Sequence, residues 1–241
     1  MNTQITLDNL AKLNLHGMVK VYNGILSMPI QEHPSLDHLM AKLTEVELQQ
    51  RADRRTQLFL KVSKLRYNAI LENVHCNVQR NFTKENLLAL ADCRFIDRAE
   101  NILITGATGC GKSYLACALG RQACTLGYKT AYFGMARFIE KIAQSKLDGT
   151  YVKFINYLDK TKLIILDDFG LHPMDTNTRL ALLQIMEDAY AKRSVIVTSQ
   201  LPVANWYEYL DDPTIADAIM DRLAVNASKI ELKGESLRKK N

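Results

Sequence analysis

The sequence lacks the features that mark secreted and membrane proteins. Among its 241 residues, no apolar run approaches the roughly 20 residues that are needed to span a bilayer. The first residues, MNTQITLDNL, have neither the basic start nor the apolar stretch of a signal peptide. We therefore expect a cytoplasmic protein with no membrane partner.

Cysteine is present, but not in a pattern that indicates a disulfide framework or a zinc site. The cysteines are odd in number, and no two of them form a CxxC pair. Histidines at the spacing of zinc ligands are also missing. In a reducing cytosol we expect free thiols, several of them buried, at Cys76, Cys93, Cys110, Cys117 and Cys124.

Flexible and repetitive segments are missing too. Glycine and proline number only 11 and 5, and there is no Gly/Ser linker, internal repeat or low-complexity tract. The length suits one large domain or a medium domain with a small one. The net charge of +5 permits nucleic-acid binding without requiring it.

Residues 1–78 are predicted to form a small helical domain. Leu7, Leu10 and Leu13 lie near helical spacing, and a second apolar run extends from Ser35 to about Val62. Ser35 follows a proline and is a plausible N-cap for that second helix.

Positive charge gathers in residues 51–66, where only Asp53 opposes it. One interpretation is that these side chains follow DNA phosphates and bind them in a salt-dependent, sequence-tolerant way. The other is a solvated helix face, which charged runs on helices usually are. The residues concerned are Arg51, Arg54, Arg55, Lys61, Lys64 and Arg66.

Residues 79–241 follow a different pattern, in which short apolar runs alternate with longer amphipathic stretches. The runs at 101–105, 129–133, 162–166, 194–199 and 228–232 are predicted strands. The stretches 112–126, 135–158 and 176–192 are long enough for helices. Strands that alternate with helices imply right-handed crossovers, so we predict an α/β domain with a mostly parallel sheet.

A complete phosphate-loop motif, GxxxxGK[ST], follows the first predicted strand and opens the first predicted helix. The glycines allow a tight loop whose amides point at phosphate oxygens, Lys112 reaches the β- and γ-phosphates, and Ser113 ligates magnesium. The sequence therefore predicts that ATP and Mg²⁺ bind here. The predicted binding residues are Gly106, Ala107, Thr108, Gly109, Cys110, Gly111, Lys112, Ser113 and Tyr114.

Two carboxylates end the predicted strand LIIL. We expect Asp167 to hold Mg²⁺ through water and Asp168 to polarise the attacking water as a general base. Many ATPases of this kind have glutamate at the second position. Aspartate is one methylene shorter, which affects the expected rate of hydrolysis more than binding.

Four further residues are candidates for roles in phosphoryl transfer. Ser199 or Gln200, at the end of the strand 194–199, could hydrogen-bond the attacking water, and the sequence leaves the choice between them open. Arg222 and Arg238 are late arginines of the kind that neutralises a transferred phosphoryl group. By itself, each of these arginines is more often an exposed surface charge.

These segments together resemble one family. NILITGATGCGKSYLACALGRQACTLGYKTAYF, LIILDDFG, IVTSQLP, IMDRL and GESLR occur in the order found in IstB proteins, the AAA+ helper ATPases of insertion sequences. These proteins are close relatives of the DnaC and DnaI helicase loaders. The resemblance covers essentially the whole chain, including the Leu13–Met18 region.

The resemblance implies an AAA+ (ASCE) P-loop sheet with strand order 5-1-4-3-2, flanked by helices. It implies homo-oligomers with ATP at subunit interfaces, assembly on double-stranded DNA, and a transposase of the same element as partner. Arg222 matches the arginine finger that acts in trans, and Arg238 matches the sensor-2 arginine. Only three residues follow Arg238, so we expect little or no C-terminal helical lid. Because the family acts on DNA, we favour the DNA interpretation of residues 51–66.

Two alternatives remain. A replicative helicase loader would share nearly the same ATPase core. A small-molecule kinase could use the same phosphate loop, but residues 135–160 lack an arginine-rich lid. An ABC-type ATPase is disfavoured because no LSGGQ-like segment occurs in the sequence.

Overall fold

The computed structural model describes residues 3–237. Its contacts divide the chain into two compact units, residues 1–58 and 59–241. The boundary lies earlier than the one between residues 78 and 79 that the sequence suggests. The reason is that Leu65, Ala69 and Leu71 pack against Cys117 and Ala118 of the second unit.

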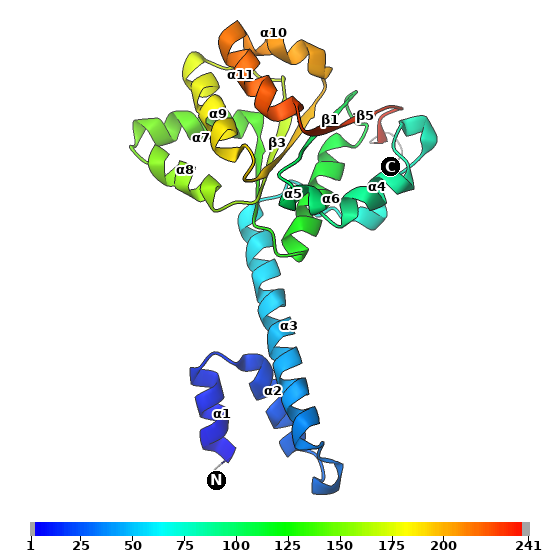
Figure 1. The fold of residues 1–241 in the computed structure, drawn as a ribbon, viewed down its shortest axis with the longest axis vertical. Helices are drawn as coiled ribbons and strands as arrows, with labels where there is room; N and C mark the ends of the chain where they lie inside the picture. Colours follow the sequence, from blue (N-terminus) through cyan, green and yellow to red (C-terminus); the bar gives the residue numbers. More distant parts are fainter. Residues whose placement is uncertain (1–2, 238–241) are drawn as a thin grey trace. The chain divides into compact units, whose positions relative to one another are not determined.

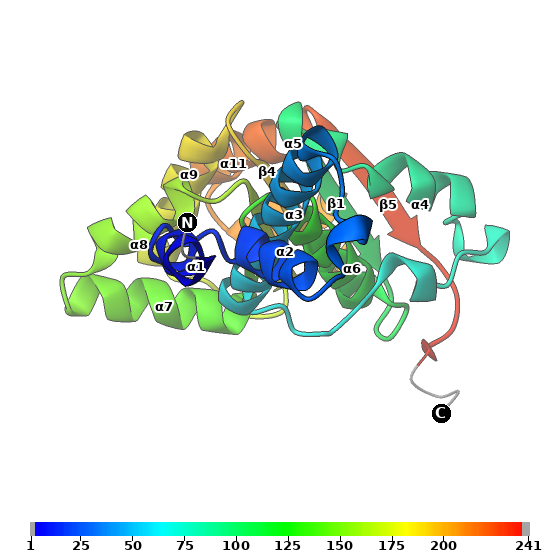
Figure 2. The same ribbon diagram turned by 90° about the horizontal axis from the view of Figure 1, so that it is seen from below.

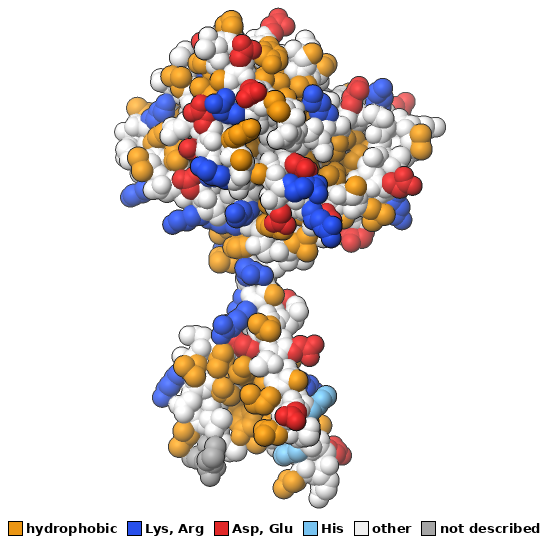
Figure 3. Space-filling model, viewed as in Figure 1, with side chains coloured by type: hydrophobic (Ala, Val, Ile, Leu, Met, Phe, Trp, Pro, Cys, Tyr) orange, Lys and Arg blue, Asp and Glu red, His pale blue; other side chains and the backbone are white. Residues whose placement is uncertain are grey.

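The first unit is helical, as expected. It contains α1 (Thr3–Lys12), α2 (His16–Leu26), a 3-10 turn (Ile30–Glu32) and most of α3 (Leu36–Ser63). The Gly17 amide donates to Glu47 Oε2 at 2.7 Å, and a Cβ on Gly17 would lie 2.7 Å from Glu47 Cα. Glycine is therefore what allows α2 to approach α3 so closely. Figure 3 shows hydrophobic side chains gathered on the exposed surface of this unit.

The second unit contains five parallel strands in the order β2-β3-β4-β1-β5, which is the predicted order 5-1-4-3-2 read from the other edge. This confirms the predicted fold class. Each strand begins and ends within three residues of its predicted bounds. The strands are β1 (Asn101–Gly106), β2 (Thr130–Gly134), β3 (Leu163–Phe169), β4 (Ser194–Ser199) and β5 (Ala227–Leu232).

Both faces of the sheet are covered by helices (Figures 1 and 2). One face packs on α7 (Met135–Leu147), α8 (Tyr151–Asp159), α9 (Thr176–Ala189), α10 (Trp206–Leu210) and α11 (Pro213–Ala224). The other packs on α4 (Lys84–Ala91), α5 (Arg94–Asp97) and α6 (Lys112–Thr125).

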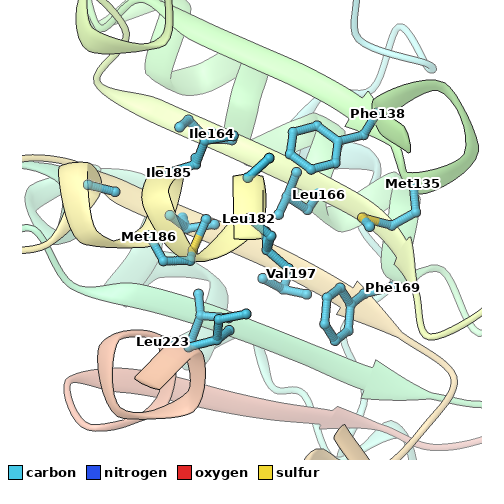
Figure 4. Close-up of a cluster of buried hydrophobic side chains, with 14 of the residues drawn as sticks. Met135, Phe138, Ile164, Leu166, Phe169, Leu182, Ile185, Met186, Val197 and Leu223 are labelled. Carbon is cyan, nitrogen blue, oxygen red and sulfur yellow. The ribbon is translucent and has the colours of Figure 1, made fainter. Parts of the chain in front are cut away.

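Successive residues of a strand point to opposite faces, so each strand contributes to two cores. In β3, Ile164 and Leu166 belong to the first core, whereas Leu163 and Ile165 belong to the second. This explains why the strand is a continuous apolar run. Figure 4 shows the first core, where side chains of β3 and β4 meet Leu182, Ile185 and Met186 of α9.

Part of the helix prediction is wrong. The stretch 135–158 forms two helices, not one, because the chain turns at Asp148–Thr150. Asp148 Oδ1 accepts hydrogen bonds from the Thr150 amide at 3.0 Å and the Thr150 hydroxyl at 2.5 Å, which stabilises the turn. Within residues 3–237, no helix is both long and apolar enough to traverse a bilayer.

Candidate nucleotide-binding site

The phosphate-loop motif borders a cavity of about 710 Å³ at the carboxyl ends of β1, β3 and β4. Ligands of open α/β sheets bind at this edge, and the volume is in the range of small-molecule sites. Of the predicted nucleotide residues, Thr108, Gly109, Gly111, Lys112, Ser113 and Tyr114 line the cavity. Asp168 and Gln200 line it too, so the structure brings three separate predicted segments together.

The loop has the backbone geometry that its glycines suggest. Gly106 has a φ of +143°, and a Cβ there would lie 2.2 Å from the Leu232 carbonyl oxygen. Helix α6 begins directly after the loop and directs its amino end, which favours anions, at the cavity. Lys112 Nζ donates to the carbonyl oxygens of Gly106 at 2.8 Å and Ala107 at 2.9 Å. The lysine is therefore already held over the loop.

Asp167 is fully buried at the end of β3 and is held by three side chains. The Thr198 hydroxyl donates to its Oδ1 at 2.5 Å. The Tyr132 hydroxyl donates to its Oδ2 at 2.5 Å, and Arg66 Nη1 lies 3.5 Å from the same atom. Burial, together with the hydrogen bond to Asp167, raises the pKa of Tyr132, so the phenol stays protonated and remains a donor.

Asp168 has a strained backbone. Its φ of +64° lies in the left-handed region, and the pairing of β3 with β4 shifts register between Leu166 and Phe169. The Thr198 hydroxyl accepts a hydrogen bond from the Asp168 amide at 3.1 Å. This turn directs the carboxylate of Asp168 into the cavity while Asp167 stays behind it. Strain of this kind is typical of functional sites.

The structure separates the two candidates at the end of β4. Ser199 is buried, and its hydroxyl donates to the Phe169 carbonyl oxygen at 2.6 Å and accepts from the Leu201 amide at 3.0 Å. Gln200 lines the cavity, where its Oε1 accepts from the Thr108 hydroxyl at 2.6 Å. The geometry therefore favours Gln200 as the residue near the phosphates.

Arg222 lies away from the phosphate loop of its own chain. The side-chain amide of Asn101, at the start of β1, donates to the Arg222 carbonyl oxygen at 2.9 Å, whereas the loop follows the other end of that strand. The six-residue strand puts about 16 Å between these two edges. Arg222 Nη2 lies 3.1 Å from Glu187 Oε1. Any contact of Arg222 with a γ-phosphate must therefore be made with a neighbouring copy.

Arg238 lies outside the described residues. The chain just before it does reach the phosphate loop, since the Leu237 amide donates to the Gly109 carbonyl oxygen at 3.0 Å. Leu237 also lines the nucleotide cavity.

The six basic residues of the segment 51–66 are all exposed, but two of them have acidic partners. Arg51 Nε lies 2.7 Å from Glu47 Oε1. Arg66 Nη1 lies 3.1 Å from Asp168 Oδ2, so this residue belongs to the nucleotide site as well as to the basic segment. Lys61, Lys64 and Arg66 line a second cavity, whereas Arg54 and Arg55 lie within the first unit.

Several residues of the site were not assigned to it from the sequence, among them Arg66, Arg80, Tyr132 and Thr198. Arg80 lines the cavity and donates to the Cys110 carbonyl oxygen of the phosphate loop. It precedes the first predicted strand in a segment without periodicity, so the sequence contains no signal for it. Thr198 carries a weak signal, because it is a polar residue that directly follows the apolar run Val195–Val197 of its strand.

All five cysteines have free thiols, and four of them are buried. Cys110, in the phosphate loop, is one of the four. The oxygen donors required for magnesium are present: the Ser113 hydroxyl borders the cavity, and Asp167 supplies a carboxylate behind Asp168. Residues 3–237 contain no cluster of three or more acidic, histidine or cysteine side chains that could hold a metal by themselves. This fits magnesium, which usually keeps several waters and binds through one or two carboxylates together with substrate phosphates.

Known proteins similar to this chain support the same interpretation. The insertion sequence ATP-binding protein y4pL of Sinorhizobium fredii is 40% identical over 97% of this chain and 96% of its own length. The insertion sequence IS1162 ATP-binding protein of Pseudomonas fluorescens is 36% identical over 84% of this chain and 88% of its own.

Among solved structures, the DnaC helicase loader matches 69% of this chain and 98% of its own, with a TM-score of 0.56. DnaI matches 69% of this chain and 92% of its own, with a TM-score of 0.59. Both are 20% identical to this chain and show that the fold is shared. The profile of the family described as "IstB-like ATP binding protein" matches residues 8–241. The chain therefore belongs to the family of IstB-like ATP-binding proteins.

Proposed function

We propose that this protein is a DNA-dependent ATPase that assists the transposition of an insertion sequence. It assembles as an oligomer on target DNA and recruits and stimulates a transposase through ATP binding and hydrolysis. The proposed ATPase activity is supported by one observation: Asp168 and Lys112 line the same cavity, and Asp167 is buried behind Asp168. Such an arrangement suits water, not a second substrate, as the phosphoryl acceptor.

Each residue then has a defined task. The amides of the loop and Lys112 hold the triphosphate, and Ser113 and Asp167 hold the magnesium, which neutralises charge on the phosphates. Asp168 accepts the proton of the attacking water, and Gln200 orients that water from the end of β4. Arg222 completes the site of a neighbouring copy, and Arg238, which lies outside the described residues, has the sensor-2 role that the family resemblance implies.

The proposal about the partner rests on the relatives. Both of the relatives described above are named insertion sequence ATP-binding proteins. In this chain the first unit, residues 1–58, exposes large apolar side chains, among them Leu13, Ile30 and Leu48, besides the basic residues Arg54 and Arg55. We assign contacts with DNA, with the transposase and with other copies to this unit.

The decisive test is ATP hydrolysis by purified protein with and without double-stranded DNA. Asp168→Asn should bind ATP as wild type does and lose about 10²- to 10⁴-fold in turnover, because the general base is gone. Lys112→Ala should lose nucleotide binding itself. Asp217→Asn is the control, because it removes an exposed carboxylate outside the cavity. Unchanged turnover in Asp168→Asn would remove that residue from its assigned role.

A replicative helicase loader is the second candidate, because the fold of DnaC and DnaI is shared. Affinity purification from cells that express both partners separates the two. Retention of the transposase supports the first function, and retention of a hexameric helicase supports the second. A phosphorylated small molecule as the product of ATP turnover would identify a kinase instead.

A further inference from the structure

Arg66 stands between the nucleotide cavity and a second, larger one. The second cavity has a volume of about 1420 Å³ and lies between the segment 61–66 and helices α7 and α8. Arg66 and Asp168 line both cavities. All of these residues belong to the unit 59–241, so their arrangement is that of one compact body.

The second cavity, which we call the basic groove, carries a strong excess of positive charge. Among the described residues, the carboxylates that line it are those of Asp148, which accepts hydrogen bonds from Thr150, and Asp168, which pairs with Arg66. Arg137 and Lys141 are one helical turn apart and therefore share a face of α7. The cations that line the groove are Lys61, Lys64, Arg66, Arg137, Lys141 and Lys153.

This charge pattern suits a chain of phosphates better than a single anion. Cations contributed by three separate elements can each meet a different phosphate, and the counterions released make such binding strong at low salt. The partly buried rings of Phe133 and Tyr157 add aromatic surface to the same groove. A nucleic-acid backbone is the ligand that combines these features.

In the structure, Arg66 pairs with the carboxylates of Asp167 and Asp168. Its Nη1 lies 3.1 Å from Asp168 Oδ2 and 3.5 Å from Asp167 Oδ2, in front of the two groups that magnesium and the attacking water require. The side chain is nevertheless 45% exposed. Ion pairs between partly exposed side chains, such as Arg66 and Asp168, are weak, so a second set of anions can compete for the same guanidinium.

Resting on the function proposed above, we propose that Arg66 is a switch between two sets of anions. When the basic groove is empty, Arg66 holds Asp167 and Asp168. When backbone phosphates of a nucleic acid occupy the groove, they draw Arg66 toward them and leave the carboxylates to the magnesium–nucleotide complex. Arg66 is thus a positioning residue through which DNA makes the site competent.

The experiment measures how much Mg²⁺ is needed for half-maximal binding of a fluorescent, non-hydrolysable ATP analogue by the full-length protein. For wild type, double-stranded DNA of arbitrary sequence should lower this concentration about two- to fivefold, the range of a half-exposed ion pair. Arg66→Gln should show the lowered concentration without DNA, and DNA should change it no further. Replacing Lys141 and Lys153 by glutamine should diminish the DNA effect.

Lys192→Gln is the charge-matched control, because Lys192 is exposed and lines neither cavity. It should behave as wild type does. If wild type binds the analogue but Arg66→Gln needs the same or more Mg²⁺, or still responds fully to DNA, the switch is refuted while the ATPase proposal stands. If wild type binds no nucleotide with Mg²⁺, the proposed function itself fails. A response to polyglutamate but not to DNA would show that the partner is a protein.

Discussion

Thr198 offers the sharpest test of how the fold prepares the proposed magnesium site. This residue is fully buried in β4, and its single hydroxyl serves both aspartates. It donates to Asp167 Oδ1 at 2.5 Å and accepts from the Asp168 amide at 3.1 Å. Thr198→Val keeps the shape of the side chain and removes both hydrogen bonds, so its effect reports the hydroxyl alone.

The expected loss of stability follows from these two bonds. A hydrogen bond to a charged group contributes about 1.5–3 kcal/mol, and an amide left unsatisfied costs about 1–3 kcal/mol. Tyr132 still donates to Asp167 in the variant, which limits the damage. We therefore expect the free energy of unfolding to fall by about 2–4 kcal/mol. Urea unfolding of the full-length protein without nucleotide measures this quantity.

The same substitution should affect magnesium more than nucleotide. Removing a side chain that orients a metal-binding group typically weakens metal affinity by about 10- to 100-fold. In EDTA, which removes Mg²⁺, the ATP analogue should therefore bind Thr198→Val and wild type with the same affinity. When Mg²⁺ is added, the affinity for the analogue should rise about 10- to 100-fold less in the variant than in wild type. Fluorescence titration with and without Mg²⁺ separates these two effects.

Thr161→Val is the matched control. Thr161 is also fully buried, but its hydroxyl donates to the neutral carbonyl oxygen of Tyr157 at 3.0 Å, away from the cavity. It should cost about 1 kcal/mol of stability and leave the Mg²⁺ effect intact. If Thr198→Val and Thr161→Val shift the Mg²⁺ effect equally, or if neither does, then the hydroxyl of Thr198 does not position the carboxylates.

Three further outcomes are expected. Hydrogen bonds from the Arg51 side chain and from backbone amides hold the pKa of Glu47 below its ordinary value, so the stability that they contribute is present at neutral pH and is lost as the pH falls below about 4. Thermal unfolding of Glu47→Gln should lack this acid-sensitive part, whereas Glu45→Gln, an exposed control, should retain it. Arg222→Ala should bind ATP normally and lose turnover. If the arginine acts between copies, mixing this variant with Lys112→Ala should restore part of the activity, because one variant supplies the intact phosphate loop and the other supplies the arginine. A mixture without activity would argue against that role. Replacing Arg54 and Arg55 by glutamine should weaken DNA binding at moderate salt. The dependence of the binding constant on salt concentration should become less steep, by the amount expected for the loss of about two phosphate contacts. If the variant binds DNA as wild type does, these residues form only a solvated helix face.

The sequence was sufficient to predict the parallel sheet and the polar residues near the carboxyl ends of its strands. Buried strands such as β3 and β4 are apolar on both faces, so their positions can be recognised without a structure. The predicted limits of β4 agree with the structure, whereas β3 continues through Asp167 and Asp168 to Phe169. The phosphate loop is local in sequence, and each of its residue types has its own physical reason. For the same reason Lys112 and Ser113 could be proposed from their own segment, whereas the end of β4 left the choice between Ser199 and Gln200 open.

What the sequence did not indicate depends on contacts between distant segments. The bond between Tyr132 and Asp167 joins residues of two adjacent strands, and the Arg66 contacts join residues more than a hundred positions apart. Helix α10 was missed because it has only five residues. Helix α11 was missed although Asp212 caps it and Ile215, Ile219 and Leu223 lie at helical spacing, so the sequence did contain a signal for it. The break at Asp148–Thr150 was missed because the amphipathic pattern continues on both sides of it.

Asp168 shows why the two carboxylates cannot be interchanged even though they are adjacent. In an undistorted strand, neighbouring side chains point to opposite faces, so only one aspartate would reach the region behind the phosphate loop. The left-handed backbone at Asp168 and the register shift beside it remove this constraint. Asp167 then keeps its place between Thr198 and Tyr132, while Asp168 turns into the cavity. The strain is offset by the Thr198 hydroxyl, which accepts from the amide of the one aspartate and donates to the carboxylate of the other. In the function proposed above, the division of labour between a metal-holding and a proton-accepting aspartate therefore depends on a threonine one strand away.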